Sequence, residues 1–159
     1  MDPAEERHGR TRLAEQEQES ARVSSSLLYL VKRLELAVRA RLEEMLKPAG
    51  ITALQYTALT VLERQDGVSA AQLARDSFVT AQTMADMVRA LESRDLIRRE
   101  PNPRNRRERL ILLTGTGRRL LAEYAEPAKG LEDRMTAELS ADETEWFRDA
   151  LNRARRGLS

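Results

Sequence analysis

Two predicted helices that lie about four residues apart constrain the fold of this chain more than any other feature. The first follows "SAAQ", where Ser69 can cap the amide of Gln72, and it runs to about Asp76. The second, "TAQTMADMVRALESR", begins at the predicted cap Thr80 and continues to Arg94. Two short helices joined by such a short turn are typical of a helix-turn-helix.

Two short apolar segments follow these helices directly and predict a β-hairpin. "LIRR" ends at Arg99, "RLILL" begins at Arg109, and prolines and asparagines fill the loop between them. Residues 98–109 carry six arginines against two glutamates. A basic hairpin after a helix-turn-helix favours a two-point grip on duplex DNA, with a helix end in the major groove and the loop on phosphates or in the minor groove. The charge by itself fits a solvated turn equally well.

Amphipathic helices are also predicted on both sides of this central region. Apolar residues recur every three or four positions from Ser20 to Lys47, and "KPAG" should end that helix. Capping residues mark three more helices: Thr52 to about Gln65, Thr114 to about Met135 (with Pro127 and Gly130 expected to kink or weaken it), and one that starts at Ser140. The predicted fold class is therefore mainly α with a small β-hairpin wing.

The composition argues against an enzyme, a metal site and a membrane protein. The chain has no cysteine, its one histidine is His8 near the N-terminus, and no carboxylate cluster has metal-ligand spacing. We therefore expect no catalytic residue, no metal and no cofactor. No run approaches the ~18 apolar residues that span a bilayer, and no secretory signal is visible, so we expect a cytoplasmic protein.

The exposed face of the second helix supplies the candidate base contacts. Four apolar residues should face the core: Met84, Met87, Val88 and Leu91. This leaves an exposed set on the other side: Thr80, Gln82, Thr83, Asp86 and Arg89. Gln82 could pair with adenine and Thr83 could contact either base or a thymine methyl, although taken alone both fit ordinary surface residues better.

Two of these exposed residues have a second interpretation. Thr80 is expected to cap the helix whether or not DNA binds. Asp86 either accepts a hydrogen bond from a cytosine amine or fixes Arg89 three residues on, and we favour the second.

The arginines of the hairpin fall into two groups. Arg104, Arg106 and Arg107 at the tip are the candidates for contacts to phosphates or to a narrow minor groove. Arg98 and Arg99 are expected mainly to position the strand, with one of them able to reach a phosphate.

The segment "LARDSFVTAQTMADMVRALESRDLIRREPNPRNRRERLILLTGTG" resembles the central signature of MarR-type winged helix-turn-helix regulators. The resemblance rests on motifs in a fixed order: Leu91-Glu92, the strand at 96–99, the basic wing at 103–107, Leu113-Thr114 and Gly117. "GITALQYTALTVL" and "LSADE" resemble the family's second and last helices, so that the similarity covers about residues 25–151.

This resemblance implies a sequence-specific DNA-binding transcriptional regulator, usually a repressor, that binds a palindromic operator as an obligate homodimer. It implies release by a small-molecule effector or by oxidation, and the absence of cysteine excludes the thiol route. The alternative in another class is a winged-helix protein-interaction module whose basic wing binds an acidic partner surface.

The resemblance also implies a division of the chain. The expected parts are a charged, partly ordered extension (1–19), an N-terminal dimerisation helix (20–47), a winged helix-turn-helix domain (51–114) and C-terminal dimerisation helices (115–157). Apolar faces on the terminal helices agree with a dimer, since a small winged domain could not bury them: Val23, Leu27, Leu30 and Leu34, with Trp146, Phe147 and Leu151.

An effector pocket would lie between the dimer helices and the winged domain. Tyr29, Arg33 and Tyr56 could contribute to it, although both tyrosines could simply be packing residues. The chain departs from the family pattern at two positions. Asn105 replaces an aspartate in the wing, so the wing should be looser, and Asp95 replaces a glycine at the exit of the recognition helix, where aspartate tolerates a left-handed backbone.

Overall fold

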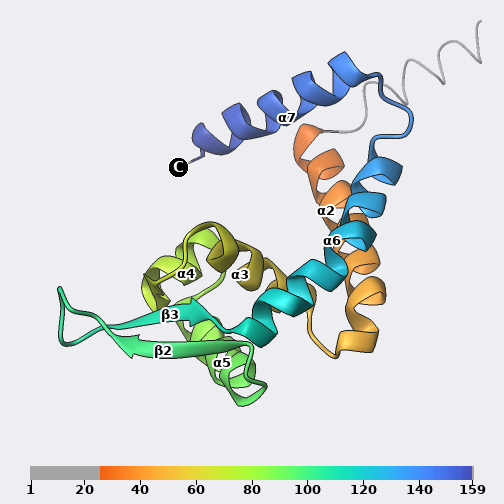
Figure 1. Cartoon of the computed structure of the whole chain (residues 1–159). Helices are drawn as coiled ribbons and strands as arrows, with labels where there is room; N and C mark the ends of the chain where they lie inside the picture. Colours follow the sequence, from red (N-terminus) through yellow and green to blue (C-terminus); the bar gives the residue numbers. More distant parts are fainter. Residues whose placement is uncertain (1–25, 159) are drawn as a thin grey trace, which may run out of the picture. The chain divides into compact units, whose positions relative to one another are not determined.

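The computed structural model describes residues 26–158, which form helices and one small sheet (Figure 1). In chain order the elements are α2 (Leu27–Leu46), the 3-10 helix η1 (Lys47–Ala49), α3 (Ala53–Arg64), β1 (Val68–Ser69), α4 (Ala70–Asp76), α5 (Ala81–Ser93), β2 (Ile97–Pro101), β3 (Arg109–Leu113), α6 (Gly115–Met135) and α7 (Ala141–Arg156). The predicted fold class is confirmed. The extension at 1–19, with His8, the predicted helix start at Ser20, and Val23 lie outside the described residues.

Two helices begin with complete capping boxes, as predicted. The side chain of Thr52 accepts a hydrogen bond from the amide of Gln55, and the Thr52 amide donates to the Gln55 side chain. Ser140 and Glu143 form the same pair at the start of α7. Each box satisfies two amides that the first turn of a helix leaves without a partner.

The predicted capping box at the start of α4 is only half formed. The Ser69 hydroxyl accepts a hydrogen bond from the Gln72 amide, so the cap itself is present. The Gln72 side chain does not return to Ser69, because its oxygen accepts a hydrogen bond from the Arg75 guanidinium at 2.5 Å, while its nitrogen donates to both oxygens of Asp76 at 2.9 Å. Arg75 therefore occupies the acceptor that the reciprocal bond would need.

Left-handed backbone conformations close two helical segments where the sequence predicted a break. Gly50 follows η1 with φ of 64°, which suits a residue without a side chain. Asp95 follows α5 with φ of 55°, which confirms that this aspartate adopts the expected left-handed backbone conformation. Helix α6 continues unbroken through Pro127 and Gly130.

The hairpin belongs to a three-stranded antiparallel sheet with strand order β1-β3-β2. Ile97 pairs with Leu113 in the hairpin, and Val68 of β1 pairs with Ile111 on the other side of β3. The strand at 68–69 was not predicted, because two residues are too short to show an alternating pattern. β2 is an outer strand, and its residues after Ile97 are exposed.

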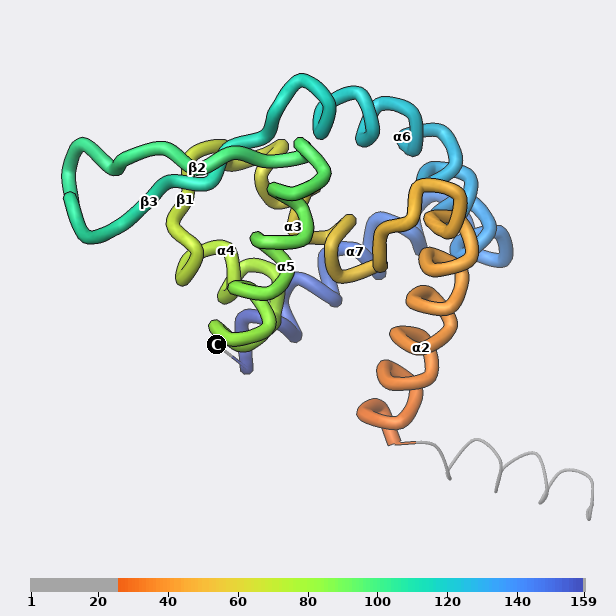
Figure 2. Tube along the Cα trace, turned by 90° about the horizontal axis from the view of Figure 1, so that it is seen from below, coloured from red at the N-terminus to blue at the C-terminus, as the bar shows by residue number. Residues whose placement is uncertain are grey.

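The core lies between the helices and the inner face of this sheet. Its largest fully buried side chains are Leu46, Leu59, Leu62, Leu73, Met84, Leu91, Ile97, Ile111 and Leu113. Helix α5 buries Met84, Met87, Val88 and Leu91, which are the four residues predicted to face inward. The β2–β3 hairpin extends beyond helices α3, α4 and α5, as both ribbon and tube show (Figures 1 and 2).

The terminal helices expose large apolar side chains. The chain divides into two compact units at the Arg41–Leu42 boundary, so that most of α2 forms a unit of its own. In that part of α2, Leu27 and Leu28 are each 79% exposed. In α7, Trp146 is 64% exposed and Leu151 is also exposed. Both helices thus expose large apolar side chains that a soluble monomer normally buries, although Leu46 at the end of α2 is buried in the core.

Candidate nucleic-acid interface

Helices α4 and α5 form the predicted helix-turn-helix, joined by residues 77–80. The Thr80 hydroxyl accepts a hydrogen bond from the Thr83 amide at 3.1 Å, which caps α5, and it donates to the Thr83 hydroxyl at 2.9 Å. Thr80 and Gln82 are exposed, as predicted. Thr83 was expected to be exposed but is half-buried, because its side chain folds back onto the cap.

Asp86 and Arg89 form an ion pair on the exposed face of α5. This confirms the preferred prediction, in which the carboxylate fixes the arginine three residues on. The pair holds the guanidinium of Arg89 beside the helix, where the arginine side chain is 66% exposed. Arg89 is thus positioned and stays accessible.

The wing loop is a pair of successive turns that two asparagines organise. The side-chain oxygen of Asn102 accepts a hydrogen bond from the Arg104 amide at 2.9 Å, and that of Asn105 accepts one from the Arg107 amide at 3.1 Å. These are the Asx turns for which asparagine and aspartate are both suited. Asn105 therefore organises the second turn of the wing loop, and the looser wing that we expected stays a prediction.

Arg98 and Arg99 position the wing strand, as predicted. Nε of Arg98 lies 2.8 Å from a carboxylate oxygen of Glu100. Arg99 makes a bidentate contact with Glu92 of α5, with nitrogen–oxygen distances of 3.1 and 2.6 Å. The hydrogen bond from Arg99 lowers the pKa of the Glu92 carboxyl below its usual value. This pair ties the outer strand β2 to α5.

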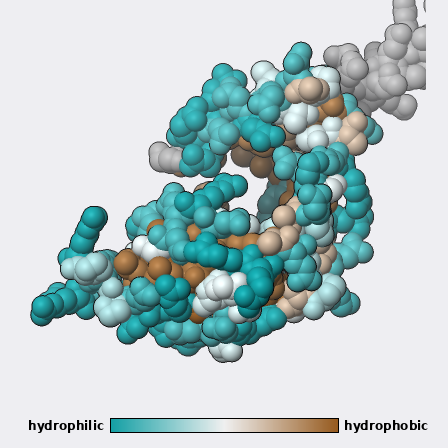
Figure 3. All heavy atoms as spheres, viewed as in Figure 1, coloured by the Kyte–Doolittle hydropathy of each residue, from teal (hydrophilic) through white to brown (hydrophobic). Residues whose placement is uncertain are grey.

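The three arginines at the tip differ from those at the base. Arg104, Arg106 and Arg107 are exposed, and within residues 26–158 no carboxylate pairs with them. The projecting loop is predominantly hydrophilic in the space-filling view (Figure 3). The tip therefore concentrates positive charge that has no carboxylate partner within residues 26–158.

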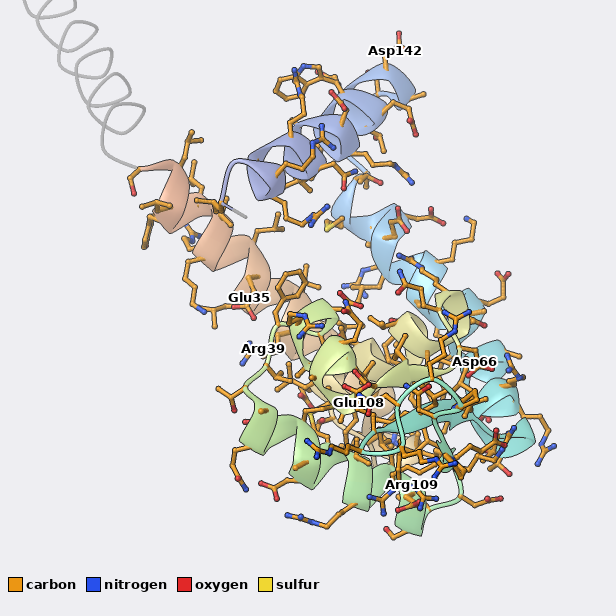
Figure 4. All side chains as sticks on the ribbon, turned by 90° about the vertical axis from the view of Figure 1, so that its left-hand side faces the viewer. Glu35, Arg39, Asp66, Glu108, Arg109 and Asp142 are labelled. Carbon is orange, nitrogen blue, oxygen red and sulfur yellow. The ribbon has the colours of Figure 1, made fainter. Side chains whose placement is uncertain are left out.

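A basic cavity of about 420 Å³ joins the two candidate contact elements. Arg89 of α5 and Arg107 of the wing both line it, together with Arg99 and Arg109. Glu108 is the acidic residue in its wall, and both Glu108 and Arg109 are labelled in Figure 4. Residues from two elements that are separate in sequence thus surround one hollow with an excess of positive charge.

Asp66 is a positioning residue that the sequence analysis did not identify. One of its oxygens accepts a hydrogen bond from the Leu113 amide at 2.9 Å, and the other pairs with Arg118 at the start of α6. Asp66, labelled in Figure 4, therefore anchors the end of β3. The sequence showed only a turn-forming Asp-Gly pair, since both partners lie about 50 residues further along the chain.

Two of the three candidate effector contacts lie close together on α2. The Arg33 guanidinium lies 5.8 Å from the centre of the Tyr29 ring, within cation–π range. Tyr56 of α3 is half-buried, and burial followed by the nearby charge of Glu63 raises the pKa of its hydroxyl. The pocket to which we assigned these residues stays a prediction.

Two kinds of feature are absent from the described part of the chain. Among residues 26–158, no group of three or more histidine, cysteine, aspartate or glutamate side chains could hold a metal ion. No described helix is both long enough and apolar enough to cross a membrane.

Comparison with known proteins places this arrangement among transcriptional regulators. Residues 51–108 match the model of the MarR family. The HTH-type transcriptional repressor Rv2887 of Mycobacterium tuberculosis is 29% identical over 125 residues, which are 79% of this chain and 90% of that protein. The matched family region covers the helix-turn-helix and most of the wing, where the basic cavity lies.

Solved structures share the fold. The MepR protein of S. aureus, solved in a complex with DNA, aligns with a TM-score of 0.75 at 24% identity and covers 84% of this chain and 99% of that one. BpsR of Bordetella bronchiseptica, whose DNA binding is regulated by 6-hydroxynicotinic acid, aligns with a TM-score of 0.75 at 22% identity, over 84% and 95% of the two chains.

Proposed function

The chain belongs to the MarR family of winged helix-turn-helix DNA-binding regulators, and from this premise we propose that it is a repressor that binds a palindromic operator as a homodimer. The basic cavity carries the proposal. Arg89 and Arg107 face one hollow from the recognition helix and the wing, so a phosphate backbone there would meet both elements at once. The repressor name of the mycobacterial relative and the DNA complex of MepR support the same function.

The exposed apolar faces support the homodimer. Leu27 and Leu28 of α2 and Trp146 and Leu151 of α7 would leave water if two copies paired through their terminal helices. A two-fold axis would then present two recognition helices to successive major grooves, ~34 Å apart. A palindromic operator follows from that symmetry.

Selection of binding sites from random duplex DNA, followed by affinity measurements at 50 and 200 mM salt, tests the proposal. We expect enrichment of a palindrome and a log–log salt slope of roughly −5 for six phosphate contacts. An affinity for DNA that ignores salt, or none, would contradict the proposal and favour a protein-interaction module with an acidic partner.

Replacing Gln82 by alanine is expected to relax the base preference while leaving the protein folded. Gln82 is exposed near the start of α5, and a bidentate pair with adenine contributes about a tenfold or greater discrimination against other bases. Repeating the binding-site selection measures the effect. Gln65→Ala, another exposed glutamine, is the matched control and should select the wild-type sequence. A selection with Gln82→Ala that returns the same consensus would exclude this role.

The double variant Trp146→Glu, Leu151→Glu is expected to dissociate the dimer, because two charges cannot be buried in an apolar interface without a large cost in free energy. Operator binding should then weaken at least about tenfold. Sedimentation should show the mass of one chain instead of two. Asn152→Glu adds a charge next to Leu151 on the polar side of α7 and should leave the dimer intact. A wild-type protein that sediments as a monomer would refute the proposed assembly.

We propose in addition that a small molecule releases the operator. The regulation of BpsR by 6-hydroxynicotinic acid supports an effector of this kind. The candidate contacts are Tyr29 and Arg33 of α2 and, in the other unit, Tyr56 of α3. A guanidinium beside an aromatic ring, as at Arg33 and Tyr29, suits a planar aromatic anion, since the guanidinium can pair with its charge and the ring can stack on it.

A further inference from the structure

Phe78 occupies a backbone conformation that is unfavourable for its side chain. It lies in the turn between α4 and α5 with φ of 57°, in the left-handed region where a bulky residue is a genuine outlier. Three other described residues share this region, and two of them are glycines, Gly50 and Gly67. A glycine at position 78 would adopt the same turn without strain.

The turn itself imposes this conformation. The amides of Ser77, Phe78 and Val79 donate to the carbonyls of Leu73, Arg75 and Ala74 at 2.9, 3.2 and 3.1 Å, which closes the last turn of α4. The path of the chain from α4 into α5 depends on these bonds. The strain at Phe78 is therefore a fixed property of the helix-turn-helix.

Packing does not compensate for the strain. Ser77 is buried and Val79 is half-buried, whereas the side chain of Phe78 is 77% exposed. Asp95, the other strained residue, has local compensation, because its carboxylate accepts a hydrogen bond from the Thr116 hydroxyl at 3.2 Å. The ring of Phe78 can accept no such bond. An aromatic residue that neither packs nor bonds inside the described chain indicates a contact outside it.

The position of Phe78 specifies where that contact is. It lies two residues before Thr80, the cap of α5, in the turn that joins α4 to the end of α5 that carries Gln82. If the start of α5 enters the major groove, the preceding turn reaches the groove edge beside it. Among the groups that base pairs present there, the apolar one is the 5-methyl of thymine, with which a phenylalanine can pack.

We propose that Phe78 is a specificity-determining residue whose ring packs on a thymine methyl next to the bases that Gln82 faces. This inference rests on the proposed operator binding. In this arrangement, Phe78 of the turn recognises a base through an apolar contact, and Gln82 of α5 recognises a neighbouring base through hydrogen bonds. It also accounts for a strained phenylalanine where glycine would fold more easily.

The test combines a variant protein with operators that lack single methyl groups. Phe78→Gly is expected to raise the melting temperature, because it removes the strain, and yet to weaken operator binding about fourfold per half-site. Replacing thymine by deoxyuridine, one symmetric position at a time, removes only the methyl. At one position, this replacement should weaken operator binding by the wild-type protein by the same factor. It should leave operator binding by Phe78→Gly unchanged. Phe78→Asn, which also tolerates the left-handed backbone, should behave as Phe78→Gly does.

The outcomes separate the two proposals. If the wild-type protein binds its operator in a salt-dependent manner and Phe78→Gly shows the same sensitivity to every deoxyuridine substitution, the role of Phe78 is refuted and operator binding stands. If the wild-type protein binds no operator, the proposed function itself fails. A Phe78→Gly protein that is less stable than the wild type would contradict the strain on which the inference depends.

Discussion

Removing the three tip arginines together, as Arg104→Ala, Arg106→Ala, Arg107→Ala, is expected to weaken operator binding at least about a hundredfold at physiological salt. These side chains are exposed, and within residues 26–158 they have no carboxylate partner, so their charge is available to DNA. In a homodimer, two wings would lose six positive charges, and the log–log salt slope should shrink by about 0.9 for each of these charges that contacts a phosphate. Fluorescence anisotropy with a labelled operator between 50 and 200 mM salt measures both quantities.

A matched variant with three lysines in place of these arginines separates charge from shape. It should keep most of the salt slope, since lysine also neutralises phosphates. It should lose any preference for a narrow A-tract minor groove, because the planar guanidinium is the better fit. Thermal unfolding should be nearly unchanged for both triple variants, as it is for most exposed substitutions. Unaltered affinity of the alanine variant would show that the wing does not contact DNA.

The second large effect concerns Gly117 in the first turn of α6. Replacing it by alanine is expected to lower the free energy of unfolding by about 3 kcal/mol and the melting temperature by about 10 °C. A Cβ atom at this position would lie 2.2 Å from the carbonyl oxygen of Leu96 and 3.1 Å from Cδ2 of Leu113. The clash is with backbone, which cannot rotate away as a flexible side chain would.

Gly130 in the same helix provides the control. A Cβ atom there would meet nothing within 4 Å among the described residues. Gly130→Ala should therefore stabilise the helix by about 0.5–1 kcal/mol, since alanine loses less backbone entropy. Chemical denaturation of both variants gives the comparison. Equal stability of Gly117→Ala and the wild type would mean that α6 does not approach Leu96 as closely as described.

Local signals predicted most of the fold. The caps at Thr52, Thr80, Thr114 and Ser140 each depend on residues three positions apart, and all four are present. The left-handed exit at Asp95 follows in the same way from what a short polar side chain tolerates. The central elements were accessible because propensity, capping and hydrophobic period agree along this part of the chain.

Long-range contacts explain what the sequence did not predict. β1 exists only because Val68 pairs with Ile111 of a strand 43 positions further on. Asp66 bonds to Leu113, and Arg94 donates to the carbonyls of Ala49 and Gly50. No periodicity links such pairs. Phe78 was overlooked for a different reason: its residue type predicts a core position, and only the backbone angle and the exposure of the ring indicate otherwise.

The outer strand β2 affects how the protein aggregates at high concentration. An edge strand offers free amides and carbonyls to which a second sheet can add, which leads to aggregation. Here that edge carries Arg98, Arg99 and Glu100 and ends at Pro101, which has no amide hydrogen to donate. Charge repulsion and the missing donor oppose edge-to-edge growth, so the same residues that hold the wing in place also keep the protein from polymerising through it.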